Sequence, residues 1–208
     1  MPPHPAQHPV VEGWFALVLG AGRGRRMGGP KPLMDAGGRP WWRVQESRLD
    51  AAGIPRLWVL SDDAGAAMLD AGFIPERATI ADPDAPMFES LAAGIAGLVP
   101  DEPRGVFVLP ADVPAPGPAV WPALALAAAD AVARPVYKGK HGHPAALSGT
   151  WIEQVLGPAM EDGKEHRLDE LIAGVVRDVE VDDPTVSVNL NSPRDLSRWL
   201  AAQARDSA

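Results

Sequence analysis

The segment from Trp14 to Leu33, WFALVLGAGRGRRMGGPKPL, constrains the fold of this chain more than any other part of its sequence. A short apolar run, Phe15 to Leu19, predicts a buried β-strand, and the glycines after it predict a tight loop at the end of that strand. Glycine lets backbone N–H groups face an anion without interference from Cβ atoms. Three arginines and one lysine lie in the same loop, and such side chains form charge-assisted hydrogen bonds with phosphate. The segment therefore predicts a phosphate-binding loop; the alternative is a surface turn that happens to be basic.

Two common phosphate-binding loops do not match this segment. The dinucleotide fingerprint requires a third glycine three residues after the second, but Arg25 or Met27 stands there, depending on which glycine is counted first. The P-loop requires Lys and then Ser or Thr directly after its last glycine, whereas prolines flank Lys31 on both sides. The loop is therefore expected to be of a third kind.

Length and composition narrow the class of protein. A chain of 208 residues is expected to form one α/β domain. Its formal net charge of −8 argues against nucleic acid as a partner. No apolar run has the length of a membrane span, and the start, MPPHPAQHPV, lacks the pattern of a secretory signal, so no membrane partner is expected. The absence of cysteine excludes disulfides and thiolate metal sites and fits a cytoplasmic protein.

Apolar runs and helical patterns alternate along the first two thirds of the chain. Further buried parallel strands are expected at Leu57–Leu60, Val106–Leu109 and Ala131–Val136. Helices are expected at Trp41–Ala52, Ala64–Ala71, Phe88–Val99 and Val120–Asp130. This alternation predicts a mostly parallel sheet with helices on both faces, in which ligands bind beyond the carboxyl ends of the strands.

The remainder of the chain has a different texture. Tyr137–His143 is expected to be a polar loop, and Val175–Val181 resembles a strand. The end, Val186–Gln203, predicts a short strand, a turn, and a helix that Ser192 caps with Pro193 in its first position. We expect a disordered tail over residues 1–12 and a single domain over residues 13–204, with a nucleotide-binding half at about 13–134 and an acceptor-binding half at about 135–204.

Asp112 stands between two prolines directly after a predicted strand, in the segment LPADVP. Proline fixes the backbone on both sides, so the carboxylate is held in one direction. A carboxylate beside a phosphate-binding loop predicts a Mg²⁺ ligand, because hard cations take oxygen ligands and bridge to phosphates. The alternative is an aspartate that caps a helix.

A second polar cluster is expected near the C-terminus. Asn189 and Asn191, with Asp195 further on, follow a predicted strand. One of them would complete the metal site or orient Asp112; equally, the group would form an ordinary Asx turn before a helix.

The histidines do not have the spacing of a zinc site. His141 and His143 lie in a glycine-containing loop and His166 lies downstream, with no cysteine and no helical histidine pair. The Gly-His-Pro sequence around His143 is expected to form a turn that lines a pocket. Asp162 and Arg167 would contact an acceptor or simply begin a helix.

Six segments, in order, resemble one family. LGAGRGRRMGGPKPL is similar to the L-A-(A/G)-G-x-(G/S)-x-R-M-G-x-x-K opening of the MobA-like NTP transferases. LPADVP resembles their L-P-x-D-x-P metal motif. The family's S-L-x-x-G helix is similar to FESLAAGIAGL, and its R-G-H-P segment is similar to KGKHGHPAAL. Its G-D-x-G-x-R-x-L loop resembles EDGKEHRL, and its N-x-N-(T/S)-P-x-D-L end resembles VNLNSPRDL. The matches extend from Trp14 to about Leu200.

This resemblance implies a fold and a reaction. The fold would be a three-layer α/β/α arrangement around a mostly parallel, Rossmann-like sheet of the nucleotide-diphospho-sugar transferase type. The activity would be Mg²⁺-dependent transfer of NMP from an NTP, CTP or GTP, to a phosphorylated small-molecule acceptor such as molybdopterin, with release of pyrophosphate. The alternatives are a sugar-phosphate or other metabolite nucleotidyltransferase and, in another class, a nucleotide-binding regulatory protein without catalysis.

The resemblance also implies residue roles. Catalysis would rest on Lys31, Arg26 and Asp112, the metal site on Asp112 and Asn191, and acceptor binding on His143, Asp162 and Arg167. The nucleotide-binding residues would be Leu19, Gly20, Ala21, Gly22, Arg23, Gly24, Lys31 and Ser90. Two departures weaken this assignment: Gly20 stands where the family has Ala, and the family's glycine before Ser90 is missing.

Ala21 bears on the choice of nucleotide base. Members of the family that use CTP tend to have Ala at this place, and those that use GTP tend to have Gly. The methyl group of Ala21 would narrow the base pocket and favour a pyrimidine. The missing side chain at Gly20 could restore the space that this methyl group takes. The Gly-His-Pro turn also favours CTP, while Asn189 and Asn191 favour GTP.

Overall fold

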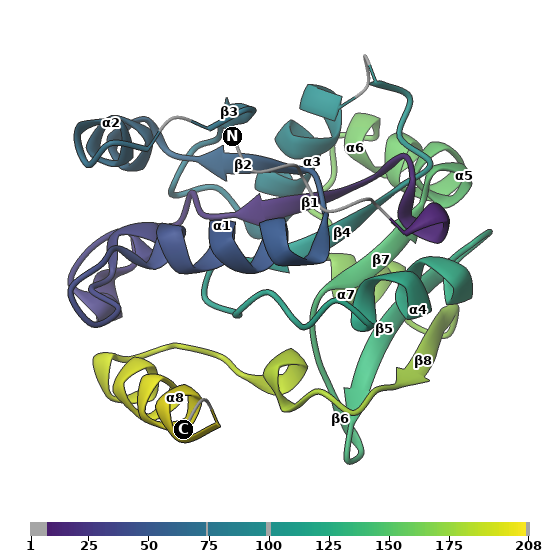
Figure 1. The fold of residues 1–208 in the computed structure, drawn as a ribbon. Helices are drawn as coiled ribbons and strands as arrows, with labels where there is room; N and C mark the ends of the chain where they lie inside the picture. Colours follow the sequence, from purple (N-terminus) through teal and green to yellow (C-terminus); the bar gives the residue numbers. More distant parts are fainter. Residues whose placement is uncertain (1–7, 74, 99–100, 207–208) are drawn as a thin grey trace.

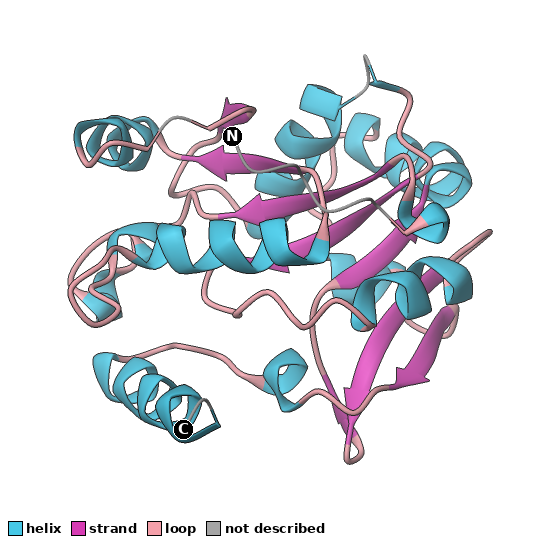
Figure 2. Ribbon diagram, in the orientation of Figure 1, coloured by secondary structure: helices cyan, strands magenta, loops and turns pink. Residues whose placement is uncertain are grey.

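The computed structural model describes residues 8–73, 75–98 and 101–206 of the chain. Its centre is an eight-stranded sheet in the order β3-β2-β1-β4-β7-β5-β6, with β8 also paired to β5. The strands are β1 Trp14–Leu19, β2 Arg56–Leu60, β3 Ala78–Ile80, β4 Gly105–Pro110, β5 Val132–Tyr137, β6 Lys140–His141, β7 Ala145–Ser148 and β8 Val176–Glu180. Figure 2 shows helices on both sides of this sheet.

The helices form two layers over the sheet (Figure 1). α1 (Trp41–Ala52), α2 (Asp62–Asp70) and α4 (Val120–Ala127) pack in one core, and α3 (Met87–Leu98) packs in the other with the short α5 (Gly149–Trp151), α6 (Gly157–Glu161) and α7 (Leu168–Leu171). α8 (Pro193–Asp206) lies against α1 in a third, smaller apolar cluster. The expected three-layer α/β fold is therefore confirmed.

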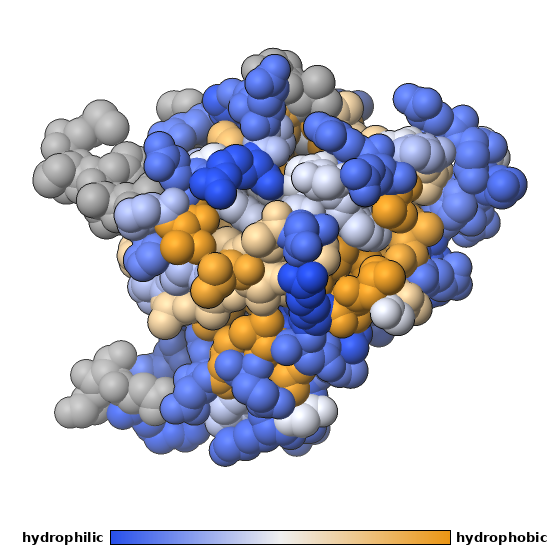
Figure 3. All heavy atoms as spheres, turned by 90° about the vertical axis from the view of Figure 1, so that its right-hand side faces the viewer, coloured by the Kyte–Doolittle hydropathy of each residue, from blue (hydrophilic) through white to orange (hydrophobic). Residues whose placement is uncertain are grey.

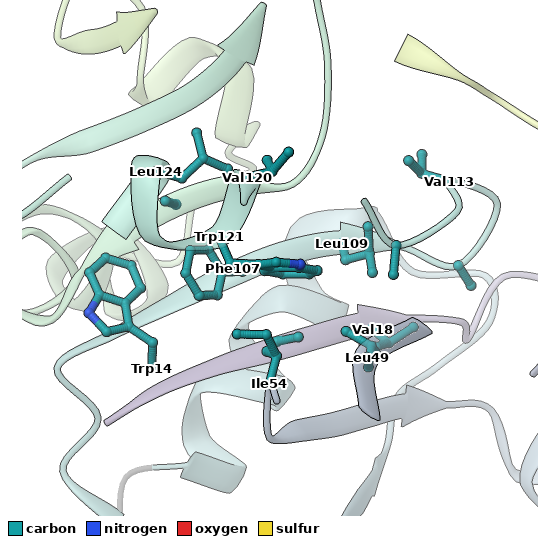
Figure 4. Packing of buried hydrophobic residues seen from close by; sticks show 14 of the residues in the cluster. Trp14, Val18, Leu49, Ile54, Phe107, Leu109, Val113, Val120, Trp121 and Leu124 are labelled. Carbon is teal, nitrogen blue, oxygen red and sulfur yellow. The ribbon is translucent and has the colours of Figure 1, made fainter. Parts of the chain in front are cut away.

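The alternation of side chains along β4 explains why both faces are covered. Val106 and Val108 point into the α3 core, and Phe107 and Leu109 point into the α1 core, as period-2 geometry requires. Phe107 lies between two tryptophans, 4.8 Å from Trp14 and 5.0 Å from Trp121 between ring centroids (Figure 4). Full burial stabilises such a large apolar side chain by about 1.5–3 kcal/mol.

The four strands expected from apolar runs are all present, and β3-β2-β1-β4 are mutually parallel. The sheet is not parallel throughout, because β7 runs antiparallel between β4 and β5. β7 was not expected: its sequence, AALS, is short and rich in alanine. Part of the expected polar loop at Tyr137–His143 forms a hairpin through β6.

The segment at Val186–Leu190 is not a strand, contrary to the sequence prediction. A 3-10 helix occupies Pro184–Ser187, and the Leu190 amide donates to the carbonyl of Asp112 rather than to a strand. The helix after it is confirmed: α8 begins at Pro193, and Ser192 Oγ accepts the amide of Asp195.

The expected boundary between a disordered tail and the domain also changes. Residues 1–7 of that tail lie outside the described residues, but Pro9–Val11 form a 3-10 helix whose Val11 is buried against the α4 core. The last residue of the expected helix at Phe88–Val99 also lies outside them. The division of the domain into two halves stays a prediction. Within the described residues, no helix combines the length and apolar character needed to cross a bilayer.

On the face that Figure 3 presents, the surface is mostly hydrophilic at its rim, and apolar side chains gather toward the middle. Figure 3 also shows a column of hydrophilic side chains that runs between these apolar side chains. Large apolar residues with high exposure among the described residues are Leu69, Ile80, Met87, Leu126 and Val175. They belong to different elements, and single exposed apolar residues are normal in globular proteins.

Candidate active site

A cleft of about 320 Å³ opens at the edge of the sheet where β1 and β4 end. Leu19 and Pro110, the last residues of these strands, are register partners, so the loops after them begin side by side. We call these the glycine loop (residues 20–29) and the Asp112 loop (residues 111–116). The predicted site residues that line this cleft are Leu19, Gly20, Ala21, Gly22, Gly24, Arg26, Lys31, Ser90, Asp112 and Asn191. Their roles stay predictions, but the structure brings them to one place.

Backbone geometry explains the glycine at position 24. Gly24 has φ +60°, and a Cβ atom there would lie 1.9 Å from the carbonyl oxygen of Gly29. The Gly24 carbonyl accepts the amide of Met27 over 2.7 Å, which begins a 3-10 turn. Gly22, by contrast, borders open space on its Cβ side and lines the cleft. Gly24 therefore shapes the loop, and Gly22 leaves room for a ligand to approach the backbone.

The cations of the glycine loop divide into two groups. Arg25 and Arg26 are exposed and line the cleft, as does Lys31 just beyond the loop. Arg23 instead forms a bidentate ion pair with Asp84, across to the segment between β3 and α3. This hydrogen-bonded pairing raises the pKa of Arg23 and lowers that of Asp84. Arg23 does not line the cleft and already has an acidic partner, and its nucleotide-binding role stays a prediction.

Asp112 lies at the floor of the cleft and is nearly buried, with 8% of the residue exposed. Its Oδ2 atom accepts a hydrogen bond from Lys31 Nζ. The Asp112 loop follows β4 directly, and the backbone amide of Ala111 still donates to Leu19 over 2.9 Å. The sheet therefore holds the predicted metal ligand beside the predicted phosphate ligand.

The polar cluster near the C-terminus separates in the structure. Asn191 lines the cleft, because the neighbouring Leu190 amide hydrogen-bonds to the carbonyl of Asp112. Asp195 serves the start of α8 instead: its Oδ2 accepts from Ser192 Oγ over 2.6 Å. Asn191 remains the member of this cluster that could share a cation with Asp112.

The oxygen donors of the cleft fit Mg²⁺ bound together with a substrate. Asp112 supplies a carboxylate and Asn191 an amide oxygen. Mg²⁺ is commonly held by one or two carboxylates together with substrate phosphates and water. Among the described residues there is no cluster of three or more His, Cys, Asp or Glu that could hold a metal without substrate. This donor set therefore suits a cation that arrives with phosphate.

His143 lies close to this site without lining the cleft. Burial lowers its pKa, and the charge of Asp112 opposes that shift. Its buried Nδ1 atom has no hydrogen-bond partner among the described residues. The backbone amide of His143 donates to Val186 over 2.8 Å, which anchors the Gly-His-Pro turn.

Asp162 and Arg167 do not line the cleft, and their acceptor-binding role stays a prediction. Asp162 accepts from the Lys164 amide and pairs with His166; these hydrogen bonds lower the pKa of Asp162. Arg167 pairs with Asp169 on α7. Both residues therefore have partners close to them in the sequence.

Sequence reasoning missed one wall of the cleft. This wall is made by Asp82, Pro83, Ala85 and Met87. It follows β3, a three-residue strand whose sequence, Ala-Thr-Ile, is mostly exposed and gave no apolar signal. Because parallel strands end at one edge, recognising β3 would have placed this segment beside the glycine loop.

Comparisons with known proteins agree with this geometry. Residues 16–181 match the model of the MobA-like NTP transferase domain, while no curated protein shows significant similarity to the chain. Many solved structures share the fold, and three of them illustrate it. A nucleotidyl transferase from Methanothermobacter is 21% identical (TM-score 0.73; 93% of this chain and 98% of that chain covered). Molybdopterin-guanine dinucleotide biosynthesis protein A from Archaeoglobus fulgidus is 17% identical (TM-score 0.67; 91% of this chain and 98% of that chain covered). The manganese complex of Rv0371c from Mycobacterium tuberculosis is 18% identical (TM-score 0.63; 91% of this chain and 98% of that chain covered). The family match covers most of the chain and both loops of the cleft, so the protein belongs to the MobA-like NTP transferases and is a nucleotidyltransferase.

Proposed function

We propose that this protein transfers NMP from an NTP to a phosphorylated small-molecule acceptor in a Mg²⁺-dependent reaction and releases pyrophosphate. The observation that carries the proposal is the composition of one cleft: a glycine loop, the cations Arg26 and Lys31, and the carboxylate of Asp112. An acceptor phosphate oxygen would attack the α-phosphorus, and the bond from that phosphorus to the bridging oxygen of pyrophosphate would break. No proton need be removed from an ionised phosphate, so the protein's task is positioning and charge neutralisation.

Each residue has a separate part in this reaction. Amides of the glycine loop and the side chains of Lys31 and Arg26 would bind the β- and γ-phosphates and offset charge on the leaving pyrophosphate. Asp112 and Asn191 would hold Mg²⁺, which supplies Lewis-acid stabilisation of the phosphoryl oxygens when bound. Ser90, buried at the start of α3 and lining the cleft, would contact the nucleotide.

The base pocket favours CTP over GTP in this proposal. Ala21 is buried and lines the cleft, so its methyl group would narrow a base pocket formed there and disfavour a purine. The missing side chain at Gly20 does not return that space, because its Cβ position lies 3.0 Å from Pro32 and 3.3 Å from Leu60. That side of Gly20 is filled by the protein itself.

Molybdopterin is the proposed acceptor on the family resemblance, and sugar phosphates are the second candidate class. His143 is proposed as an acceptor-binding residue on the same resemblance. It lies outside the lining of the cleft; burial lowers its pKa, and Asp112 is near enough for its charge to oppose that shift. A cytoplasmic location is part of the same proposal.

A pyrophosphate-release assay with CTP or GTP, Mg²⁺ and a panel of acceptors tests this function. Molybdopterin should support turnover, and sugar 1-phosphates should not. Turnover with sugar 1-phosphates alone would favour the second enzyme class. Nucleotide binding without turnover on any phosphorylated acceptor would favour a regulatory protein and contradict the proposal.

A further inference from the structure

Three side chains of α1 reach from one side of the helix to the backbone of the Asp112 loop. Trp41, Gln45 and Arg48 occupy helical positions i, i+4 and i+7, which share a face. Trp41 Nε1 donates to the carbonyl of Ala111 over 2.6 Å. Arg48 Nε donates to the carbonyl of Ala115 over 2.5 Å.

Gln45 makes the central contacts. Its Nε2 donates to the Val113 carbonyl over 2.7 Å and, more weakly, to the Ala111 carbonyl over 3.4 Å. Its Oε1 accepts the amide of Ala115 over 2.8 Å. Gln45 is fully buried, and without it the Val113 carbonyl and the Ala115 amide would lose the partner it provides, whereas the Ala111 carbonyl would keep Trp41.

The sequence of the Asp112 loop explains why it needs outside partners. Prolines stand at positions 110, 114 and 116 and remove backbone donors. The carbonyls of Ala111 and Val113, on either side of Asp112, therefore receive their hydrogen bonds from α1. The backbone is fixed on both sides of the one carboxylate in the proposed metal site.

We propose that Gln45, supported by Trp41, is a positioning residue that aims the Asp112 carboxylate at the metal; this inference rests on the proposed function. A metal ligand must be held within about 0.5 Å of its working position by the shell around it. The loss of such a supporting contact typically costs about 10–100-fold in metal affinity or activity. If Gln45 had a purely structural role, its loss would lower the stability of the protein without a specific loss of metal affinity.

The test compares four full-length variants with the native protein. Gln45→Met keeps the length of the side chain and removes every hydrogen bond. Trp41→Phe removes the donor to Ala111 together with part of the buried indole, and keeps an aromatic ring against Trp199. Asp112→Asn changes the ligand itself. Ser148→Ala is the matched control, because Ser148 is buried, holds one amide, and lies at the opposite edge of the sheet beside Gly105.

Two readouts are needed besides thermal unfolding. The first is Mn²⁺ binding to the protein alone, followed by loss of the free-ion signal in electron paramagnetic resonance and extended into the millimolar range. The second is turnover as a function of Mg²⁺, with the KM for nucleotide measured at saturating Mg²⁺. Gln45→Met should weaken Mn²⁺ binding and raise the half-saturating Mg²⁺ about tenfold, while the nucleotide KM changes by less than about twofold. Trp41→Phe should shift both metal values in the same direction by a smaller factor, and Ser148→Ala should shift neither.

The outcomes separate this inference from the proposed function. Weak Mn²⁺ binding in Asp112→Asn with native binding in both Gln45→Met and Trp41→Phe would overturn the inference alone. Native Mn²⁺ binding in Asp112→Asn would reject the metal site and the inference together. If the native protein alone binds no Mn²⁺, the Mg²⁺ dependence of turnover decides the question: an unchanged half-saturating Mg²⁺ in both Gln45→Met and Trp41→Phe would overturn the inference. If Gln45→Met does not fold, Trp41→Phe decides the question. An equal loss in Ser148→Ala would show that the effect is general destabilisation and would also overturn the inference.

Discussion

Lys31 Nζ lies 2.5 Å from Asp112 Oδ2, although the two residues are 81 positions apart in the chain. The glycine loop with its flanking lysine and the Asp112 loop therefore meet through their charges as well as through the sheet. The Lys31 side chain is 30% exposed and that of Asp112 11% exposed, so the pair is partly screened from water. A substitution at either residue alters the electrostatic environment of the other. The kinetics of a Lys31 or Asp112 variant therefore report on both residues.

Asp112→Asn should leave the fold intact and lower kcat by at least about a hundredfold, because the cation that offsets phosphoryl charge would lose its carboxylate ligand. Pyrophosphate release at saturating Mg²⁺ measures the effect, and circular dichroism checks the fold. Asp130→Asn, at an exposed ion pair with Arg177, is the matched control. Near-native turnover of Asp112→Asn would rule out this role.

Lys31→Ala should raise the KM for nucleotide, lower kcat, or do both, depending on whether the phosphate contact strengthens in the transition state. Steady-state kinetics and calorimetric titration with nucleotide measure the two parts. Lys140→Ala, on the exposed strand β6, removes an equal charge away from the cleft. Unchanged nucleotide binding in Lys31→Ala would indicate that the lysine only keeps its loop solvated and does not bind phosphate.

Gly24→Ala should distort the glycine loop, since a left-handed backbone costs a non-glycine residue about 1–2 kcal/mol and the new Cβ would collide with Gly29. We expect weaker nucleotide binding with a small fall in the melting temperature, because the loop is at the surface. Gly29→Ala places a methyl group in open space and should bind nucleotide like the native protein. Equal affinities for the two variants would contradict this reading of Gly24.

Arg23→Ala should change nucleotide KM by no more than about threefold, because exposed ion pairs contribute little and Arg23 is held by Asp84. The same substitution at Arg26, which lines the cleft, should have the larger effect. Kinetics at one ionic strength compare the two. A larger loss from Arg23→Ala would restore Arg23 to the phosphate ligands predicted from sequence.

Ala21→Gly should shift the ratio of kcat/KM values toward GTP. One methyl group in a pocket discriminates by roughly 1–3 kcal/mol, so the native preference for CTP is expected to be partial. Parallel assays with both nucleotides, for the native protein and the variant, give the ratio. A native preference for GTP, or no shift in the variant, would show that Ala21 does not select the base.

The parts of the fold that were predictable are those with a local signal. Apolar runs identified β1, β2, β4 and β5, and helical spacing identified α1 with the bounds that the structure has. β3 and β7 escaped because each has only three or four residues and draws its stability from neighbouring strands. The hydrophobic periodicity of a strand can be recognised in its own sequence, but its pairing with neighbouring strands cannot be recognised in three or four residues.

The site followed the same division. The glycine loop and Asp112 carry strong local signals, and both lie in the cleft. The resemblance implied a nucleotide-binding role for Arg23 and a catalytic one for Arg26, but the sequence did not show that Asp84, 61 residues from Arg23, pairs with Arg23. The contacts of Gln45 with the Asp112 loop were equally invisible, because a buried glutamine in a helix has no sequence signature of its own.

The place of Asn191 in the cleft has a consequence for the order in which the protein matures. The cleft begins with Leu19 and is completed by a residue of the segment that leads into α8. That segment is fixed by α8 packing on α1, where Trp199 meets Trp41 at 5.3 Å between ring centroids. During synthesis the glycine loop and Asp112 can assemble early, because domains begin to form from their N-terminal side. Asn191 is the last of the lining residues in chain order, so this wall of the cleft can form only after the other lining residues have been made.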